Sequence, residues 1–203
     1  VFGVWFAAVV VSVVWLVSLL AFGHLSFFAL HPRTASSLPD VLWFSSTHFD
    51  FNHLWSNTAV LGVFSFVLAG LYFTRAPLMF VVLWLSSGLL TWLTGPADSS
   101  IVGVSAVVYA LFAALVAGLV RTGTLTGFLA AGLFVVGYFA QMASGLVGTG
   151  GSVAWQAHLA GLVAGLAVAW LFPAPVFDDL DDSDDSDDDT SVVSSDDLLG
   201  PGG

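Results

Sequence analysis

The sequence predicts an all-α, polytopic membrane protein with six transmembrane helices and a polar tail. Of its 203 residues, 58% are hydrophobic and only 8% are charged, whereas about 25% are charged in an ordinary soluble domain. The apolar residues gather in six stretches near the length of about 20 residues that crosses a bilayer as a helix. A water-soluble globular fold is therefore excluded.

The six stretches are separated by polar or turn-forming breaks. The predicted spans cover residues 1–22, 51–74, 77–93, 101–120, 125–142 and 153–172. The third span ends at Gly95-Pro96, because proline lacks the backbone donor and restricts the residue before it. A Gly-rich loop from Ser144 to Ser152 separates the last two spans. We expect these helices to form one membrane domain over residues 1–177.

Residues 178–203 form an acidic, low-complexity tail. Eleven of the fourteen Asp residues lie between Asp178 and Asp197, so the net charge of −11 belongs to this segment. Such a composition cannot bury enough apolar surface to offset chain entropy, and we expect a disordered, solubilising extension. The use of Asp without Glu or Lys is typical of a proteome adapted to high salt, such as that of a haloarchaeon.

Composition also removes several classes of function. With no Lys, three Arg and no basic patch, the chain lacks the main source of affinity for nucleic acid. The absence of Cys excludes disulfides, thiolate nucleophiles and Cys-ligated metals. We expect no cofactor.

The placement of arginines predicts the orientation in the cell membrane. Arg75 follows the second span and Arg121 follows the fourth. Since cytoplasmic loops carry the excess of basic residues, these two loops are expected in the cytoplasm. The N-terminus and the tail then lie in the cytoplasm too, and the N-terminal ends of spans two, four and six face the extracellular side.

A few polar residues stand inside the predicted spans, where such groups are costly and by default mark function. His53 and Asn57 share one face of the second span, Ser105 lies near the start of the fourth, and His158 lies near the start of the sixth. These three spans run in the same direction, so their N-terminal ends lie together. We expect Ser105 and His158 about one turn inside their helices, in one shallow intramembrane site.

A hydroxyl and an imidazole together indicate nucleophilic catalysis. Serine is a poor nucleophile until a base takes its proton, and imidazole is the usual base. Acyl transfer also needs donors for the developing oxyanion, which the Asn57 amide, the His53 ring and the Ser105 backbone could supply. The acids outside the tail lie in or beside loops, so a Ser–His dyad is expected rather than a triad. Those acids are Asp40, Asp50 and Asp98.

Three further residues would support the dyad. Tyr109 lies one turn beyond Ser105 and could fix the His158 ring by packing against it. Gly161 and Gly165 form a small-xxx-small face that lets the sixth span approach the fourth closely. Each residue also has an ordinary explanation, since membrane Ser often bonds its own backbone and a buried His is often merely hydrogen-bonded. The conjunction of all of them favours catalysis.

These residues resemble the motifs of the rhomboid family of intramembrane serine proteases. The motifs are His48-x4-His53-x3-Asn57, Gly103-x-Ser105 with Tyr109, and His158-x2-Gly161-x3-Gly165. The resemblance implies Ser105 as nucleophile, His158 as general base, and His53 and Asn57 as oxyanion-hole side chains. It implies a structural role for His48 at the entry to the second span.

The resemblance further implies single-span membrane proteins as substrates, unwound near the outer end of their helix and cut after a small residue. The loop Ser144–Ser152 would then be a flexible cap, with entry from the side near spans two and five. Three alternatives stay open: a catalytically silent rhomboid-like binder of membrane proteins, a transporter, and a metal site. The metal site would need His48, His53 and His158 to converge.

Overall fold

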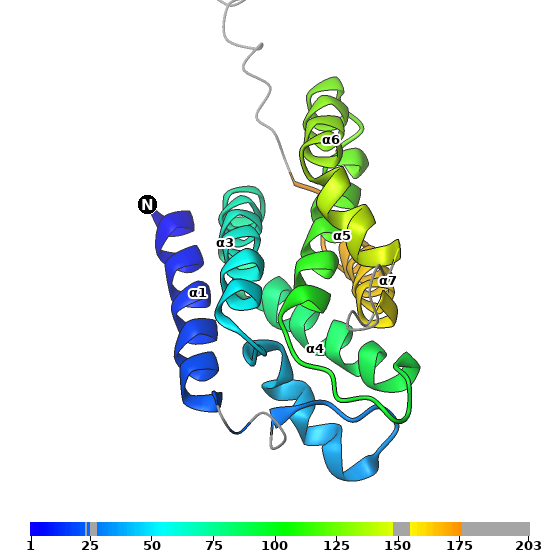
Figure 1. Ribbon diagram of the computed structural model, residues 1–203. Helices are drawn as coiled ribbons and strands as arrows, with labels where there is room; N and C mark the ends of the chain where they lie inside the picture. Colours follow the sequence, from blue (N-terminus) through cyan, green and yellow to red (C-terminus); the bar gives the residue numbers. More distant parts are fainter. Residues whose placement is uncertain (23, 25–27, 148–154, 176–203) are drawn as a thin grey trace, which may run out of the picture.

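The computed structural model describes residues 1–22, 24, 28–147 and 155–175, and it is a bundle of apolar α-helices (Figure 1). The prediction of an all-α membrane bundle is confirmed. Six helices correspond to the six predicted spans. They are α1 (Phe2–Ala21), α3 (Phe51–Tyr72), α4 (Ala76–Thr94), α5 (Ser105–Arg121), α6 (Leu125–Val147) and α7 (Trp155–Leu171).

Length and composition make several of these helices candidate membrane spans. Three segments of the described chain are long and apolar enough to cross a bilayer: Phe2–Ala21, Phe51–Thr94 and Leu125–Val147. The segment Phe51–Thr94 contains both α3 and α4, joined by the short 3-10 helix η3 (Phe73–Arg75). The helices α5 and α7 are shorter apolar helices of 17 residues each. Large apolar side chains on the outside of the bundle suit contact with lipid.

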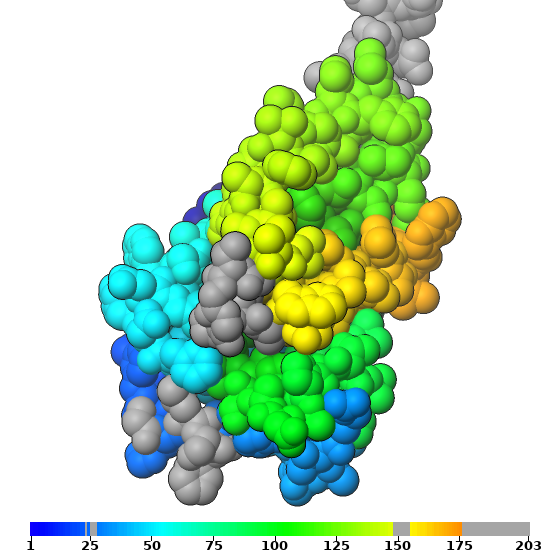
Figure 2. Space-filling view, turned by 45° about the vertical axis from the view of Figure 1, so that its right-hand side comes forward, coloured from blue at the N-terminus to red at the C-terminus, as the bar shows by residue number. Residues whose placement is uncertain are grey.

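The central helix of the bundle is α5, and α6 is its most peripheral neighbour. Eleven of the 17 residues of α5 are buried, whereas α6 buries only three of 23. Helix α7 packs along α5 and also against α4, and α1 packs against α3. At one end of the molecule α6 reaches beyond the other helices (Figure 2). The site described below therefore draws on one deeply embedded helix and one loosely packed helix.

Local sequence explains how α3 and α4 begin. Asp50 is the N-cap of α3, and its carboxylate accepts a hydrogen bond of 2.9 Å from the His53 backbone N–H. An Asp at this position satisfies one of the free donors at a helix start. In α4, Pro77 stands in the first turn, where its missing N–H costs nothing. The helix ends before Gly95-Pro96, as predicted.

Two short 3-10 helices fill the polar stretch between α1 and α3. They are η1 (Ala35–Leu42) and η2 (Phe44–Ser46). Indole donors of α4 hold this connection, because Trp84 donates to the Leu42 carbonyl and Trp92 donates to the Thr34 carbonyl, each at 3.1 Å. The sequence predicted only a polar break here.

The predicted start of the fourth span at residue 101 is wrong. Ile101 pairs instead with Leu30 in an antiparallel bridge of two 2.9 Å backbone hydrogen bonds, which holds the segment extended. Gly103 then adopts a φ of +111°, and α5 begins only at Ser105. Ser105 is consequently the first residue of its helix rather than one turn inside it, while His158 is the fourth residue of α7.

The predicted loop Ser144–Ser152 needs a second correction. Residues 144–147 are helical and form the last turn of α6, which ends at Val147 rather than near Met142. The rest of that loop, residues 148–152, lies outside the described residues. So does the predicted disordered tail, residues 178–203.

Candidate active site

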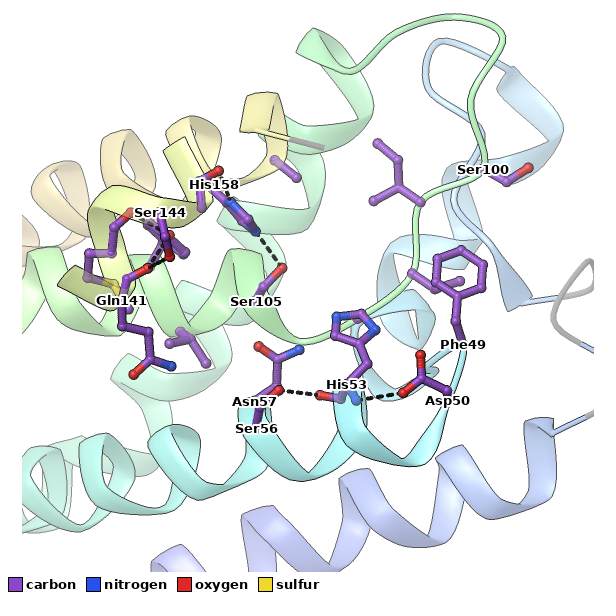
Figure 3. A pocket seen from close by; sticks show the side chains of 18 residues that line it. Phe49, Asp50, His53, Ser56, Asn57, Ser100, Ser105, Gln141, Ser144 and His158 are labelled. Atoms are coloured by element: carbon purple, nitrogen blue, oxygen red, sulfur yellow. Dashed lines mark hydrogen bonds between the residues drawn. The ribbon is translucent and has the colours of Figure 1, made fainter. Parts of the chain in front are cut away.

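A cavity of about 630 Å³ lies where the N-terminal ends of α3, α5 and α7 meet the C-terminal end of α6. The extended segment 100–103 forms a further wall. Figure 3 shows how the polar side chains of these elements gather around it. The like-directed helices α3, α5 and α7 thus bring together residues that are far apart in the sequence.

The two predicted reacting groups are in direct contact. The Ser105 Oγ lies 2.9 Å from the Nε2 atom of His158, and Figure 3 shows this hydrogen bond. The opposite ring nitrogen, Nδ1, lies 2.8 Å from the backbone carbonyl oxygen of Gly145. A carbonyl can only accept, so Nδ1 carries the proton and Nε2 of the neutral ring accepts from the serine hydroxyl.

Tyr109 packs on the face of the imidazole, as the spacing predicted. The ring centroids of Tyr109 and His158 lie 4.3 Å apart with an interplanar angle of 7°. The Tyr109 hydroxyl in turn donates a 2.7 Å hydrogen bond to the Met142 carbonyl. The imidazole of His158 is thus held both at its edge and on its face.

Two glycines of α7 allow α7 to lie against α5. A Cβ atom at Gly161 would meet the Ala106 carbonyl oxygen, and one at Gly165 would meet the Ala110 carbonyl oxygen. Both side-chain positions are therefore filled by the backbone of α5. This close approach places His158 within hydrogen-bond distance of Ser105.

His53 and Asn57 lie on α3 and point into the cavity from the side opposite Ser105 (Figure 3). The His53 ring is stacked near Phe49, with centroids 6.4 Å apart. Within the described part of the chain, neither the His53 ring nor the Asn57 amide has a hydrogen-bond partner. Both side chains are consequently available as donors to a bound group.

The backbone turn before Ser105 leaves no room for a side chain. A Cβ at Gly103 would lie 2.9 Å from the Cε1 atom of His53, and its φ of +111° suits glycine alone. The turn is also held from outside the cavity, because the Gly103 N–H donates to the Phe44 carbonyl at 3.1 Å. Gly103 therefore allows the start of α5 to approach the His53 ring.

His48 is fully buried behind this turn and does not line the cavity. The Ser18 hydroxyl donates to the Ser46 carbonyl and so accepts from Nδ1 of His48 at 3.0 Å. The other nitrogen, Nε2, accepts from the Val104 N–H at 3.4 Å. Burial lowers the pKa of His48 to about 3, with the nearby His53 adding to the effect. A neutral imidazole thus links α1 to the residue before Ser105.

Sequence reasoning missed the partners that α6 and α1 supply. The carbonyls of Gly145 and Met142 are backbone groups, and no side-chain pattern indicates where a backbone carbonyl points. Ser18 lies in an apolar span with no motif around it. Among the described residues, no group of three or more His, Cys, Asp or Glu residues is arranged to hold a metal ion.

Fold and site together define a multi-pass helical membrane protein with a hydrogen-bonded serine and histidine at the ends of two of its helices. Comparison with known proteins gives the family. Residues 41–175 match the model of the Rhomboid domain. That range includes every residue of the site and leaves α1 outside. The chain belongs to the rhomboid family.

Similar curated proteins come from mycobacteria, and each is described as an uncharacterized protein. Proteins of Mycobacterium bovis and Mycobacterium tuberculosis are 33% identical over 169 residues, covering 79% of this chain and 70% of theirs. A protein of Mycobacterium leprae is 34% identical over 148 residues, covering 67% of this chain and 58% of its own.

Proposed function

We propose that this protein is an intramembrane serine endopeptidase that uses Ser105 and His158 as a catalytic dyad. The observation that carries the proposal is the 2.9 Å contact between the Ser105 Oγ and Nε2 of His158, in a ring whose Nδ1 already donates to a carbonyl. In this tautomer the lone pair of Nε2 faces the hydroxyl. Such an arrangement suits proton abstraction from a nucleophile.

The reaction follows from these positions. The Ser105 Oγ attacks the carbonyl carbon of the scissile peptide bond while its proton passes to Nε2 of His158. The resulting imidazolium then protonates the leaving amine, the C–N bond breaks, and the acyl group stays on Ser105. Water then attacks the carbonyl carbon of this ester and gives a proton to Nε2 of His158. The bond between the acyl carbon and the Ser105 Oγ breaks, the imidazolium returns its proton to that oxygen, and the carboxylic acid product leaves.

The negative charge on the tetrahedral intermediate needs donors aimed at it. The Asn57 amide and the His53 ring extend into the cavity without other partners in the described chain. The Ser105 backbone N–H belongs to the first turn of α5, where helix donors have no intrahelical acceptor. We assign these three groups to the oxyanion hole.

The substrates we propose are single-span membrane proteins, cut near the outer end of their helix. A cavity at the helix ends suits a substrate that is partly out of the bilayer, because an extended peptide exposes backbone groups that lipid cannot satisfy. We further propose that the site opens to the extracellular side, with the N-terminus and the tail in the cytoplasm; the positions of Arg75 and Arg121 support this orientation through the positive-inside rule.

Purified protein in liposomes, incubated with a single-span reporter substrate, tests the proposal. Cleavage is expected in the wild type and in Ser100→Ala, whose exposed serine lines the same cavity. It is expected to be lost in Ser105→Ala and in His158→Ala, and to survive a chelator.

Each other result has a definite meaning. Undiminished cleavage by Ser105→Ala would overturn the dyad. Loss of cleavage with the chelator would favour a metal centre. A wild type that retains the reporter without cutting it would indicate a catalytically silent binder.

A further inference from the structure

The catalytic imidazole is held by a helix that carries neither reacting group. The described part of α6 runs to Val147, and the carbonyl of Gly145 is one of the last four carbonyls in that range, where helix acceptors are commonly left for other donors. Nδ1–H of His158 occupies that acceptor at 2.8 Å. Within the described residues, the hydrogen-bond partners of the ring are this carbonyl and Ser105.

The same turn of α6 holds the stacking partner of the ring. The Tyr109 hydroxyl donates to the Met142 carbonyl at 2.7 Å, three residues before Gly145. The carbonyls of Met142 and Gly145, both in α6, therefore fix the face and the edge of the His158 imidazole. If this turn moved, His158 would lose its acceptor, and the ring on which it stacks would lose its anchor.

The electrostatics of a helix end add to the geometry. The C-terminus of a helix carries a partial negative charge of about half an electron, which favours a nearby cation. His158 becomes an imidazolium when it takes the serine proton, and it does so beside the end of α6. The three described acids, Asp40, Asp50 and Asp98, make no hydrogen bond to it.

We propose that the last turn of α6 does for His158 what the acid of a Ser–His–Asp triad does: its Gly145 carbonyl fixes the tautomer and orientation of the imidazole and stabilises the imidazolium. Gly145 is thus a positioning residue. The kinetic consequence rests on the proposed peptidase function, whereas the protonation pattern of the ring does not.

This role requires a glycine at position 145. A Cβ there would lie 2.8 Å from Nδ1 and 3.0 Å from Cε1 of His158, and it would collide with the Tyr109 hydroxyl. Two other glycines of the same helix, Gly132 and Gly137, have no neighbouring atom within 4 Å of such a Cβ. Alanine favours helix more than glycine does, so α6 itself tolerates either change.

The orientation of His158 also depends on the position of α6 in the bundle. This helix buries three of its 23 residues, far fewer than the eleven of 17 in α5. The contacts that position His158 therefore come from a helix with few buried residues of its own. A displacement of α6 from α5 and α7 would break the hydrogen bonds of the Gly145 and Met142 carbonyls.

The kinetic test compares Gly145→Ala with Gly137→Ala in the full chain in liposomes. Displacing a catalytic group by about 1 Å costs on the order of 100-fold in rate. We therefore expect kcat of Gly145→Ala to fall about 100-fold while KM is nearly unchanged, and Gly137→Ala to match the wild type. Wild-type kcat in a folded Gly145→Ala would overturn the proposal.

A spectroscopic test is independent of cleavage, and its wild-type measurement does not depend on how well the variant folds. Nitrogen NMR of histidine-labelled wild type at neutral pH reports which ring nitrogen is protonated, and His158→Gln identifies the resonances of His158. We expect protonated Nδ1 and unprotonated Nε2 in the wild type, and a mixture of tautomers in Gly145→Ala. A wild-type ring protonated at Nε2 would overturn the proposal.

The two tests separate this inference from the proposed function. A wild type that cleaves nothing, yet shows the Nδ1–H tautomer and its loss in Gly145→Ala, would refute the peptidase and support the positioning by α6. A wild type that cleaves the reporter but carries the ring proton on Nε2 would support the peptidase and refute the positioning by α6.

Discussion

Gly161 of α7 lies directly against the backbone carbonyl of Ala106, the residue that follows Ser105 on α5. A Cβ at Gly161 would also come within 3.0 Å of the Tyr109 Cβ. The missing side chain thus lets two helix backbones touch at the level of the site. The distance between Ser105 and His158 depends directly on this contact.

Replacing Gly161 by alanine should therefore separate the two helices. A backbone carbonyl cannot move aside as the end of a side chain can, and overpacking of this kind costs about 1–3 kcal/mol. We expect a lower thermal unfolding midpoint in detergent and a large loss of cleavage. The matched control is Gly132→Ala, which has open space around it. Equal midpoints for the two variants would contradict the close contact.

Asn57→Ala should lower turnover more than it weakens substrate binding. A hydrogen bond from the Asn57 amide to the oxyanion strengthens only as charge develops, so its loss is felt mainly in kcat. We expect a fall of about 100-fold or more, measured by steady-state kinetics on the reporter. Ser56→Ala is the control, because the exposed Ser56 hydroxyl bonds the His53 carbonyl of its own helix. A change in KM alone would count against the assignment.

Acid should destabilise the fold through His48. Burial lowers the pKa of this residue from 6.5 to about 3. Between these values the unfolded chain binds a proton that the folded protein does not, so stability falls as pH decreases. The slope is at most about 1.4 kcal/mol per pH unit, and thermal unfolding in detergent across this range measures it.

The variant His48→Gln provides the comparison for this titration. Glutamine loses the ring that joins Ser18 to Val104, so we expect a lower midpoint at every pH. Because glutamine does not titrate, the decline in acid should be shallower than in the wild type. Parallel pH profiles for the two proteins would show that His48 does not control acid stability.

Removing the chain after Phe177 should leave cleavage within a few fold of the full-length rate. Every residue assigned to the site lies before that point, and the removed segment is an Asp- and Ser-rich run that suits a solubilising extension. Cleavage assays on both forms at matched protein and lipid concentrations measure the effect. A collapse of activity in the truncated form would reveal a role for the acidic tail.

The sequence was sufficient to predict the helices and the contact between Ser105 and His158. Long apolar runs define spans without any knowledge of tertiary structure, and like-directed spans necessarily share an end. The packing of Tyr109 on the imidazole also follows from helical spacing. These features depend on local composition and periodicity, which a single sequence records.

The sequence was insufficient where distant backbone groups decide the outcome. The start of α5 depends on the pairing of Ile101 with Leu30, which lies 71 residues earlier. The last turn of α6 continues through Gly145, a residue type that weakens a helix interior, while the carbonyl of that residue binds His158. Both interactions depend on backbone groups, so the pattern of side chains in the sequence does not indicate either of them.

The sparse burial of α6 leaves most of its surface to the surrounding lipid. The same helix supplies the carbonyl that is bonded to His158. If the proposed role of α6 holds, bilayer thickness becomes a variable of the reaction, because a membrane span adjusts its tilt to the hydrocarbon around it.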